Sequence, residues 1–148
     1  MARIIAYQST TPATDDLLLG TQKTTSGTNK TNPTKNFTVD SVVQAGLGYT
    51  VYTALLTQTG TSAPVATILK NNTGATLTWS RIGNGDYNVT ADSNLFTNNK
   101  TLVFVNAGSH SNTHNVYWER VSDTVVKIKT HNADDDLTNA SFEVRIYS

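Results

Sequence analysis

The 148-residue sequence contains no cysteine. This absence excludes disulfide bonds, thiolate metal ligands and cysteine nucleophiles together. The stability of the fold must therefore come from side-chain packing, strand pairing or assembly with other chains.

The chain also lacks an excess of charge of either sign and any long apolar run. Eleven basic and eleven acidic residues give a formal net charge of zero, and no basic stripe is present, so nucleic acid is not an expected partner. The apolar runs are only a few residues long, whereas a membrane-spanning helix needs about 20. Residues 1–8 lack the apolar core of a secretory signal peptide. Neither membrane insertion nor signal-directed secretion is expected.

Two uncharged polar residue types are abundant instead, with 26 threonines and 15 asparagines in the chain. Threonine favours strands because its branched Cβ fits a pleated surface. Asparagine favours turns because it tolerates left-handed backbone and bonds its own main chain. This composition indicates many short strands joined by tight turns. It is typical of a durable extracellular or particle-borne surface, or simply of a threonine-rich all-β domain.

From Gly48 onward the pattern is strand-like almost throughout. About eight strands separated by turn signals predict an all-β fold, an antiparallel sandwich or jelly-roll-like barrel. Two hairpins are expected, over residues 83–86 and 121–123. The expected strands are Tyr49–Leu56, Val65–Leu69, Thr76–Ile82, Tyr87–Ala91, Thr101–Asn106, Asn115–Arg120, Thr124–Thr130 and Phe142–Tyr147.

Alternation assigns the faces of the last strands. Val126 and Ile128 share one face of their strand, and Lys127 and Lys129 share the other. In Phe142–Tyr147, Val144 and Ile146 are expected to face inward, whereas Glu143 and Arg145 face outward.

One strand has no such alternation. Leu102, Val103, Phe104 and Val105 form a nearly continuous apolar run, so both faces of the strand are expected to be buried. The run is therefore predicted either to lie centrally in a sheet or to form a subunit contact.

Helix is expected only over Thr38–Ala45, with Thr38 as the N-cap and Gly46 as the stop. So short a helix is not stable alone in water and must be held by packing. It is expected to link an N-terminal arm to the β domain, which divides the chain into residues 1–46 and 47–148.

The N-terminal arm carries its apolar residues as small, separated islands. The arm is expected to be extended and poorly ordered alone, because such islands cannot bury one another and must pack against the β domain or a partner. The partner interpretation makes the arm an attachment segment. Its leucine block, bounded by aspartates and Gly20, is predicted to act as a compact plug rather than as a paired strand. The candidate anchor residues are Ile4, Ile5, Leu17, Leu18, Leu19 and Phe37.

Residues able to carry catalysis or bind metal are sparse. His110 and His114 lie in a turn, so their spacing does not place both rings on one face, and Asp134–Asp136 lacks the spaced ligands of a calcium loop. No serine lies in a nucleophile elbow, and no glycine-rich loop opens a helix. The sequence predicts a protein that is not an enzyme and has no catalytic residue, metal site or cofactor.

Aromatic residues are the better candidates for binding. Tyr117 and Trp118 are adjacent in a strand, so one faces the core and the other faces outward or a subunit contact. An outward ring can stack on a sugar, which makes both residues candidate glycan contacts. Trp79 and Tyr87 are read the same way, either as core residues or as glycan contacts.

Several short segments of the sequence are similar to segments of a known class of proteins. Residues 15–21 (DDLLLGT), the Thr-rich spacer and residues 34–43 (TKNFTVDSVV) resemble the start of small structural proteins of tailed phages, especially marine ones. The body is similar to a β domain of structural and fibre proteins of Bacteroidetes phages. The segments that carry this similarity are residues 49–60, 63–69, 98–101 and 143–147.

The resemblance covers most of the chain and implies a virion component whose N-terminal segment attaches to the particle while its β domain projects. It also implies a homotrimer. The leading expectation is a short head fibre or capsid decoration protein, since the chain has no room for a long tail-fibre shaft. The alternatives are a tail-fibre tip or receptor-binding protein that contacts host glycans, and a carbohydrate-binding module or a fragment of a polysaccharide-degrading enzyme.

Overall fold

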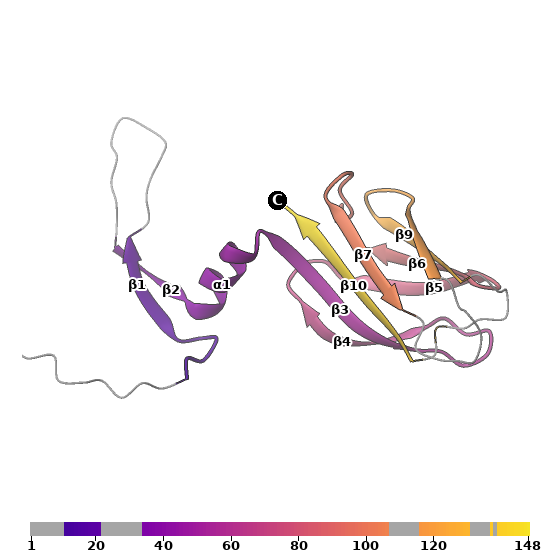
Figure 1. The fold of residues 1–148 in the computed structure, drawn as a ribbon, viewed down its shortest axis with the longest axis horizontal. Coiled ribbons are helices and arrows are strands. Elements are labelled where there is room, and N and C mark those ends of the chain that lie inside the picture. The colour runs from indigo at the N-terminus through magenta and orange to yellow at the C-terminus, as the bar shows by residue number, and fades with distance from the viewer. Residues whose placement is uncertain (1–10, 22–33, 107–115, 131–136, 138) are drawn as a thin grey trace, which may run out of the picture. The chain divides into compact units, whose positions relative to one another are not determined.

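The computed structural model describes residues 11–21, 34–106, 116–130, 137 and 139–148. The chain divides into two compact units, Met1–Leu47 and Gly48–Ser148. Figure 1 shows the ribbon, with all elements except β8 labelled.

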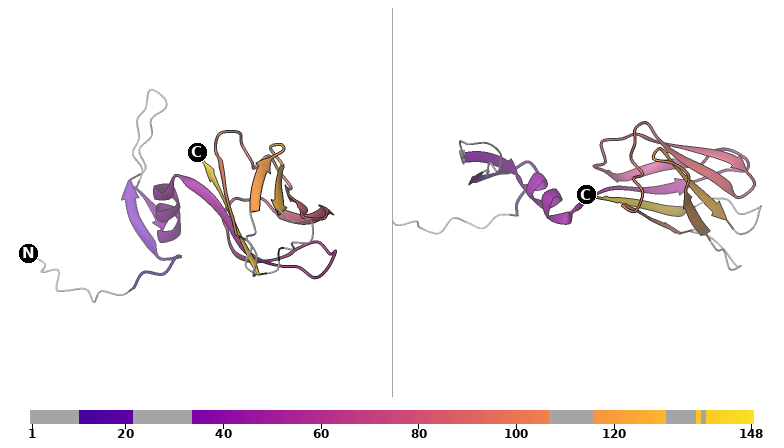
Figure 2. Two further views of the ribbon diagram at one scale, coloured as in Figure 1. Left: turned by 45° about the vertical axis from the view of Figure 1, so that its right-hand side comes forward. Right: turned by 90° about the horizontal axis from the view of Figure 1, so that it is seen from above.

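The second unit is a sandwich of two four-stranded antiparallel sheets, which form its two layers (Figure 2). The first sheet has the strand order β4-β3-β10-β7, and the second has the order β5-β6-β9-β8. An all-β sandwich-like fold is therefore confirmed. The strands are β3 (Tyr49–Thr57), β4 (Val65–Asn71), β5 (Leu77–Gly83), β6 (Asp86–Ala91), β7 (Thr101–Asn106), β8 (Val116–Arg120), β9 (Val125–Thr130) and β10 (Ala140–Tyr147).

The core lies between the two sheets and follows from the alternation of each strand. On β9, Val126 and Ile128 are fully buried, as their spacing predicts. Aromatic rings fill the centre: the ring centroid of Phe142 lies 4.9 Å from that of Trp79 and 6.1 Å from that of Tyr52. Trp79 and Tyr87 are thus core residues.

Both predicted hairpins are present. Strands β5 and β6 pair across residues 83–86, where Gly85 has a positive φ of 68° that glycine adopts without strain. Strands β8 and β9 pair across the turn at Val121–Asp123, which is closed by hydrogen bonds from the amides of Val121 and Ser122 to the carbonyl of Val125.

Strand β7 lies at the edge of its sheet, so the first of its two predicted alternatives, a central position, is wrong. The second, a subunit contact, stays a prediction. Its burial alternates: Val103 is 5% exposed and belongs to the core, whereas Phe104 is 48% exposed on the other face. Leucine and phenylalanine at the outward positions concealed this alternation, because the sequence pattern registers only that all four residues are apolar.

In the N-terminal unit, the leucine block is a strand and not a plug. Strand β1 (Leu17–Thr21) pairs antiparallel with β2 (Thr34–Thr38), and Leu18 lies opposite Phe37. The ring of Phe37 also covers Gly20: a Cβ at that glycine would lie 3.0 Å from the ring. The aromatic ring thus takes the place of the side chain that Gly20 lacks, which helps to hold the register of the pair.

Helix α1 (Val39–Leu47) follows β2 directly and is the helix that the sequence predicts. Thr38 caps it, because its hydroxyl accepts a 3.1 Å hydrogen bond from the amide of Ser41. The predicted stop at Gly46 is wrong. The helix continues through Gly46 and ends before Gly48, whose φ of 69° is the left-handed conformation that closes helices.

Candidate functional site

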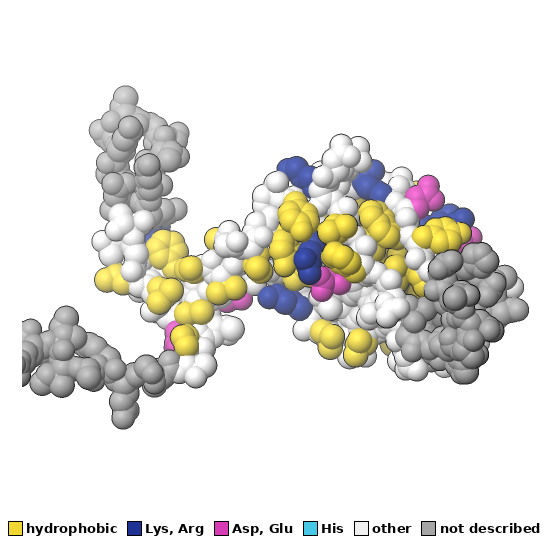
Figure 3. Space-filling model, in the orientation of Figure 1, with side chains coloured by type: hydrophobic (Ala, Val, Ile, Leu, Met, Phe, Trp, Pro, Cys, Tyr) yellow, Lys and Arg dark blue, Asp and Glu magenta, His cyan; other side chains and the backbone are white. Residues whose placement is uncertain are grey.

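The outward face of the first sheet carries an unusual set of side chains, here called the aromatic face. It is visible in Figure 3, where hydrophobic side chains surround a cationic and an anionic group on the sandwich. Arg145 and Glu143 are the charged groups at its centre, on β10. Its apolar and aromatic residues are Tyr49, Leu55, Leu102, Phe104 and Tyr147.

The register of three adjacent strands builds this face in rows. Glu143 of β10 lies between Thr53 of β3 and Phe104 of β7. The next row places Arg145 between Val51 and Leu102. On one face of a sheet, side chains that lie directly opposite or diagonal to each other on adjacent strands are close enough to interact. Residues of the two rows can therefore contact one another.

Arg145 lies between two aromatic rings. Its guanidinium carbon is 5.0 Å from the ring centroid of Tyr49 and 5.0 Å from that of Phe104, within cation–π range of both. Tyr49 in turn contacts Tyr147, with 5.3 Å between the ring centroids. The cation therefore connects aromatic residues from the three strands β3, β7 and β10.

The carboxylate of Glu143 holds the guanidinium of Arg145 by a hydrogen-bonded ion pair. Nε of Arg145 donates a 2.6 Å hydrogen bond to Oε1 of Glu143, and the hydroxyl of Thr53 donates to Oε2 at 3.2 Å. This hydrogen bond with Glu143 raises the pKa of the Arg145 guanidinium above its ordinary value, so the arginine stays charged at neutral pH. The ion pair is about one-third exposed on the arginine side, so it contributes little to stability and chiefly fixes the geometry.

An open groove of about 640 Å³ runs from this face to the side of the sandwich where the edge strands β7 and β8 contact each other. Its lining includes Thr53, Phe104, Trp118, Glu143 and Arg145. The groove thus combines aromatic surface with fixed polar groups, which is the composition of recognition surfaces in proteins.

The outward face of the second sheet is different in kind. It is mainly polar, apart from Ile82, Val125 and Tyr117, and Nζ of Lys129 lies 3.8 Å from a carboxylate oxygen of Asp86. Its polar residues, by register, are Thr78, Ser80, Asp86, Asn88, Thr90, Glu119, Lys127 and Lys129. This face is the ordinary solvated side of a sandwich.

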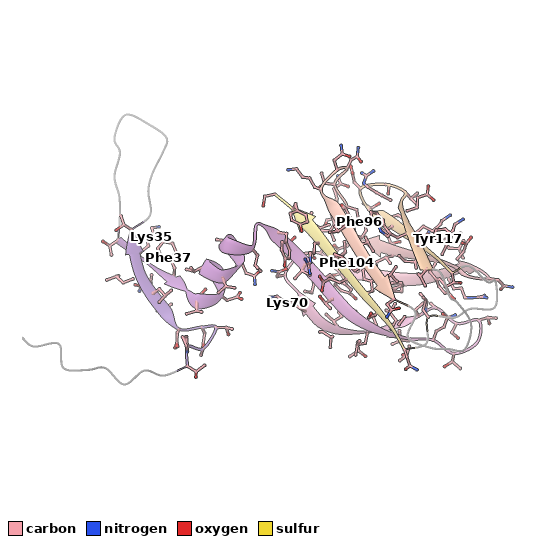
Figure 4. The ribbon with its side chains drawn as sticks, viewed as in Figure 1. Lys35, Phe37, Lys70, Phe96, Phe104 and Tyr117 are labelled. Carbon is pink, nitrogen blue, oxygen red and sulfur yellow. The ribbon has the colours of Figure 1, made fainter. Side chains whose placement is uncertain are left out.

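The two candidate glycan contacts, Tyr117 and Trp118, lie on opposite faces of strand β8. Tyr117 is 51% exposed on the outward face of β8, whereas Trp118 packs against the core and reaches the groove only at its side. Figure 4 labels Tyr117 and Phe104, which project from different sheets. One residue faces inward and its neighbour outward, as the sequence predicts.

The four predicted subunit-contact residues, all on β7, also lie on opposite faces of their strand. Leu102 and Phe104 lie on the aromatic face, Val103 is buried within the chain, and Val105 packs against the core. Val103 is therefore corrected from contact residue to core residue.

Three of the candidate anchor residues, the leucines of β1, are exposed. Leu18 is 46% exposed, with Leu17 and Leu19 more exposed still, and Phe37 is half-buried over Gly20. Helix α1 buries none of its residues, and Val42 and Val43 remain exposed. The candidates Ile4 and Ile5 lie outside the described residues.

The residues considered for metal binding, His110, His114, His131 and Asp134–Asp136, also lie outside the described residues. Among the residues that are described, no group of three or more His, Asp or Glu side chains could hold a metal ion. In the same part of the chain, no helix has the length and apolar character needed to cross a membrane.

Sequence reasoning missed most of the aromatic face. It placed Glu143 and Arg145 outward but gave no role to Tyr49, Thr53 or Tyr147. The available signal was the alternation of β3 and β10, since both strands carry aromatic residues at outward positions. The missing information was that β3 and β10 are neighbours.

Comparisons with protein-family models, curated proteins and solved structures found no significant match to this chain.

Proposed function

We propose that this protein is a non-enzymatic structural component of a phage particle, a short head fibre or capsid decoration protein. Its N-terminal unit attaches to another virion protein, and its β-sandwich projects from the particle. The resemblance of residues 15–21 and 34–43 to small phage structural proteins motivates the proposal.

The structural observation that supports the proposal is the apolar surface of the N-terminal unit. Leu17, Leu18 and Leu19 are exposed on β1, and α1 buries none of its residues. A two-stranded pair is marginal in water, and a nine-residue helix is not stable alone. A unit of this kind gains stability by burying its leucines against a partner, at roughly 1.5–3 kcal/mol for each side chain fully buried.

The test is the substitution Leu18→Asp, made in the full chain and carried into assembled particles. Loss of the leucine contact and desolvation of a carboxylate should weaken attachment by about tenfold for each 1.4 kcal/mol lost, and the copy number on purified particles should fall. The melting temperature of the sandwich should not change, because Leu18 lies in the other unit.

The matched control is Thr34→Asp, which adds the same charge at an exposed position of the same strand pair. It should leave the copy number near that of the original protein. Normal occupancy of Leu18→Asp particles would refute attachment through β1. A collapse of the melting temperature would show that Leu18 is part of the core of the body.

A second candidate function is receptor binding at a tail-fibre tip, with host glycans as ligands, and a free carbohydrate-binding module would use the same surface. The observation that favours either is the exposed ring of Tyr117. A glycan array probed with the original protein and with Tyr117→Ala tests both. A sugar signal that is lost in the variant supports glycan recognition, and a signal that is unchanged places recognition elsewhere.

A further inference from the structure

We propose that Asn84 is a site of covalent self-modification, at which the main-chain nitrogen of Gly85 attacks the side-chain amide carbon of Asn84. A bond forms between that nitrogen and Cγ, and the bond from Cγ to Nδ2 breaks. Ammonia leaves with Nδ2 and the proton of the Gly85 amide, and a five-membered succinimide ring remains. Water then opens the ring at one of its two carbonyls and gives aspartate or isoaspartate, so the reaction needs no oxidant or reductant. The inference goes beyond the proposed function and does not depend on it.

The first argument is the pair of residues at the turn between β5 and β6. Asn84–Gly85 is the one place in the sequence where glycine follows asparagine. A side chain on the following residue would crowd the attacking nitrogen, and glycine carries none. Gly85 has a φ of 68°, which glycine adopts without strain. The pair that closes this turn is therefore also the pair most open to the reaction.

The second argument is that the attacking nitrogen is held in place but has no hydrogen bond to break. The carbonyl of Gly85 accepts a 2.9 Å hydrogen bond from the amide of Thr130, the last residue of β9. Within the described residues, the amide of Gly85 itself donates no hydrogen bond. Asn84 is exposed, so water and hydroxide reach the turn.

The third argument is a contact that activates the amide. Nη2 of Arg81 donates a 2.5 Å hydrogen bond to Oδ1 of Asn84. A cationic donor withdraws electron density from Cγ, and Oδ1 is the atom on which negative charge develops when the nitrogen attacks. A donor already aimed at that atom stabilises the transition state in the manner of an oxyanion hole. The guanidinium holds the oxygen and not Nδ2, so the leaving group is not retained.

The fourth argument is that the fold can receive the product. Nε of Arg81 is buried and makes no hydrogen bond within the described part of the chain. A carboxylate at position 84 would give this guanidinium an anionic partner, with twelve acidic residues in the chain against eleven basic ones. The neighbouring Asp86 has its own cation, since Nζ of Lys129 lies 3.8 Å from its carboxylate. Isoaspartate instead lengthens the main chain inside the turn that the pairing of Gly83 with Asp86 closes.

The experiment incubates the full chain at neutral and mildly alkaline pH, folded and in urea, and follows every asparagine by peptide mass mapping. In the folded protein, Asn84 should convert faster than any other asparagine. Its rate should rise with pH, because the attacking amide must lose its proton. In isotopically labelled water, one labelled oxygen should enter each product. Asn84→Gln, which would have to close a six-membered ring, is the control and should show little conversion.

Two variants test the role of Arg81. Arg81→Met should slow conversion in the folded protein about three- to tenfold, a smaller effect than in an enclosed active site because the turn is exposed. In urea, where the contact with Asn84 is lost, Arg81→Met should convert at the original rate. Asn84→Asp should raise the melting temperature, and the gain should disappear when Arg81→Met is added.

Asn84 that stays intact in the folded protein but converts in urea would overturn the proposal, because the turn would then protect the step. Equal rates for the folded original protein and folded Arg81→Met would also overturn it. If Arg81→Met does not fold, the mass mapping of the original protein still decides, and a melting temperature of Asn84→Asp below the original would contradict the product geometry. No particle is needed, so failure here is distinguishable from a failure of the attachment proposal.

Discussion

The guanidinium of Arg145 lies 5.0 Å from the ring centroid of Phe104, and the two residues come from neighbouring antiparallel strands at diagonal positions. The contact exists because the last strand of the chain, β10, lies between β3 and β7. The two long-range pairings of β10 thus bring outward residues of three separate segments together on a single surface.

Phe142 is expected to be the most costly single truncation in the core. It is 1% exposed and contacts both Trp79 and Tyr52. Phe142→Ala should lower the free energy of unfolding by about 3–5 kcal/mol, through lost apolar burial and the cavity that remains. Urea denaturation measures it, with Tyr117→Ala as an exposed aromatic control. A loss below about 1 kcal/mol would show that the two sheets close over the site.

Tyr52 is expected to make stability fall at alkaline pH. Burial raises the pKa of its phenol above the ordinary value of 10.0, and the indole of Trp79 partly opposes the shift. Above about pH 10 the unfolded chain loses this proton while the folded chain keeps it, so the free energy of unfolding decreases as pH rises. Tyr52→Phe should flatten this decrease in denaturation curves collected between about pH 8 and 11, whereas the exposed Tyr117→Phe should leave it unchanged.

At neutral pH the same substitution should cost little. The phenol oxygen of Tyr52 and Nε1 of Trp79 are buried, and neither makes a hydrogen bond of normal geometry within the described residues. Removing an unsatisfied hydroxyl from a core relieves its desolvation penalty. A loss of more than about 2 kcal/mol for Tyr52→Phe at pH 7 would contradict this account.

Gln58 is expected to anchor Leu137, which lies shortly before β10. Its side chain is 6% exposed, Oε1 accepts a 2.9 Å hydrogen bond from the amide of Leu137, and Nε2 donates to the carbonyl of Gly60 at 3.0 Å. Gln58→Leu keeps the volume but leaves a buried amide unsatisfied, which should cost about 1–3 kcal/mol. Thermal denaturation against Thr59→Ala, an exposed neighbour, measures it. Equal stability of the two variants would show that water replaces the glutamine.

Thr38 is expected to control the order of α1. Its hydroxyl accepts from the amide of Ser41, and removing such a cap costs about 0.5–2 kcal/mol. Because α1 buries no residue, Thr38→Ala should abolish most of the amide-exchange protection of residues 41–47, while Thr38→Ser retains it.

In the original protein, the amides of β1 and β2 should exchange faster than those of β10. Strong protection of β1 and β2 in a monomer would make the segment a stable part of the fold.

The sequence by itself determined the local structure of the sandwich. Alternation located Val126, Ile128 and Val144 in the core, and glycine with asparagine marked the hairpin at residues 83–86. A threonine before an apolar stretch was sufficient to place the helix cap. These features depend on a few adjacent residues, so a short window of sequence contains all the information required.

Only the tertiary structure decided which strands are neighbours. The pairing of β10 with β3 and β7 joins segments far apart in the chain, and no local pattern encodes that choice. Because of this pairing, Leu102 and Phe104 lie on the exposed face of an edge strand rather than in the buried centre of the sheet. The same pairing brings Tyr49 into contact with Arg145. Likewise, the leucines of β1 became a paired strand because β2 offers a matching edge and Phe37 covers Gly20. Long-range pairing depends on the packing of the whole domain, and for that reason the aromatic face emerges from the fold and not from the pattern of any one strand.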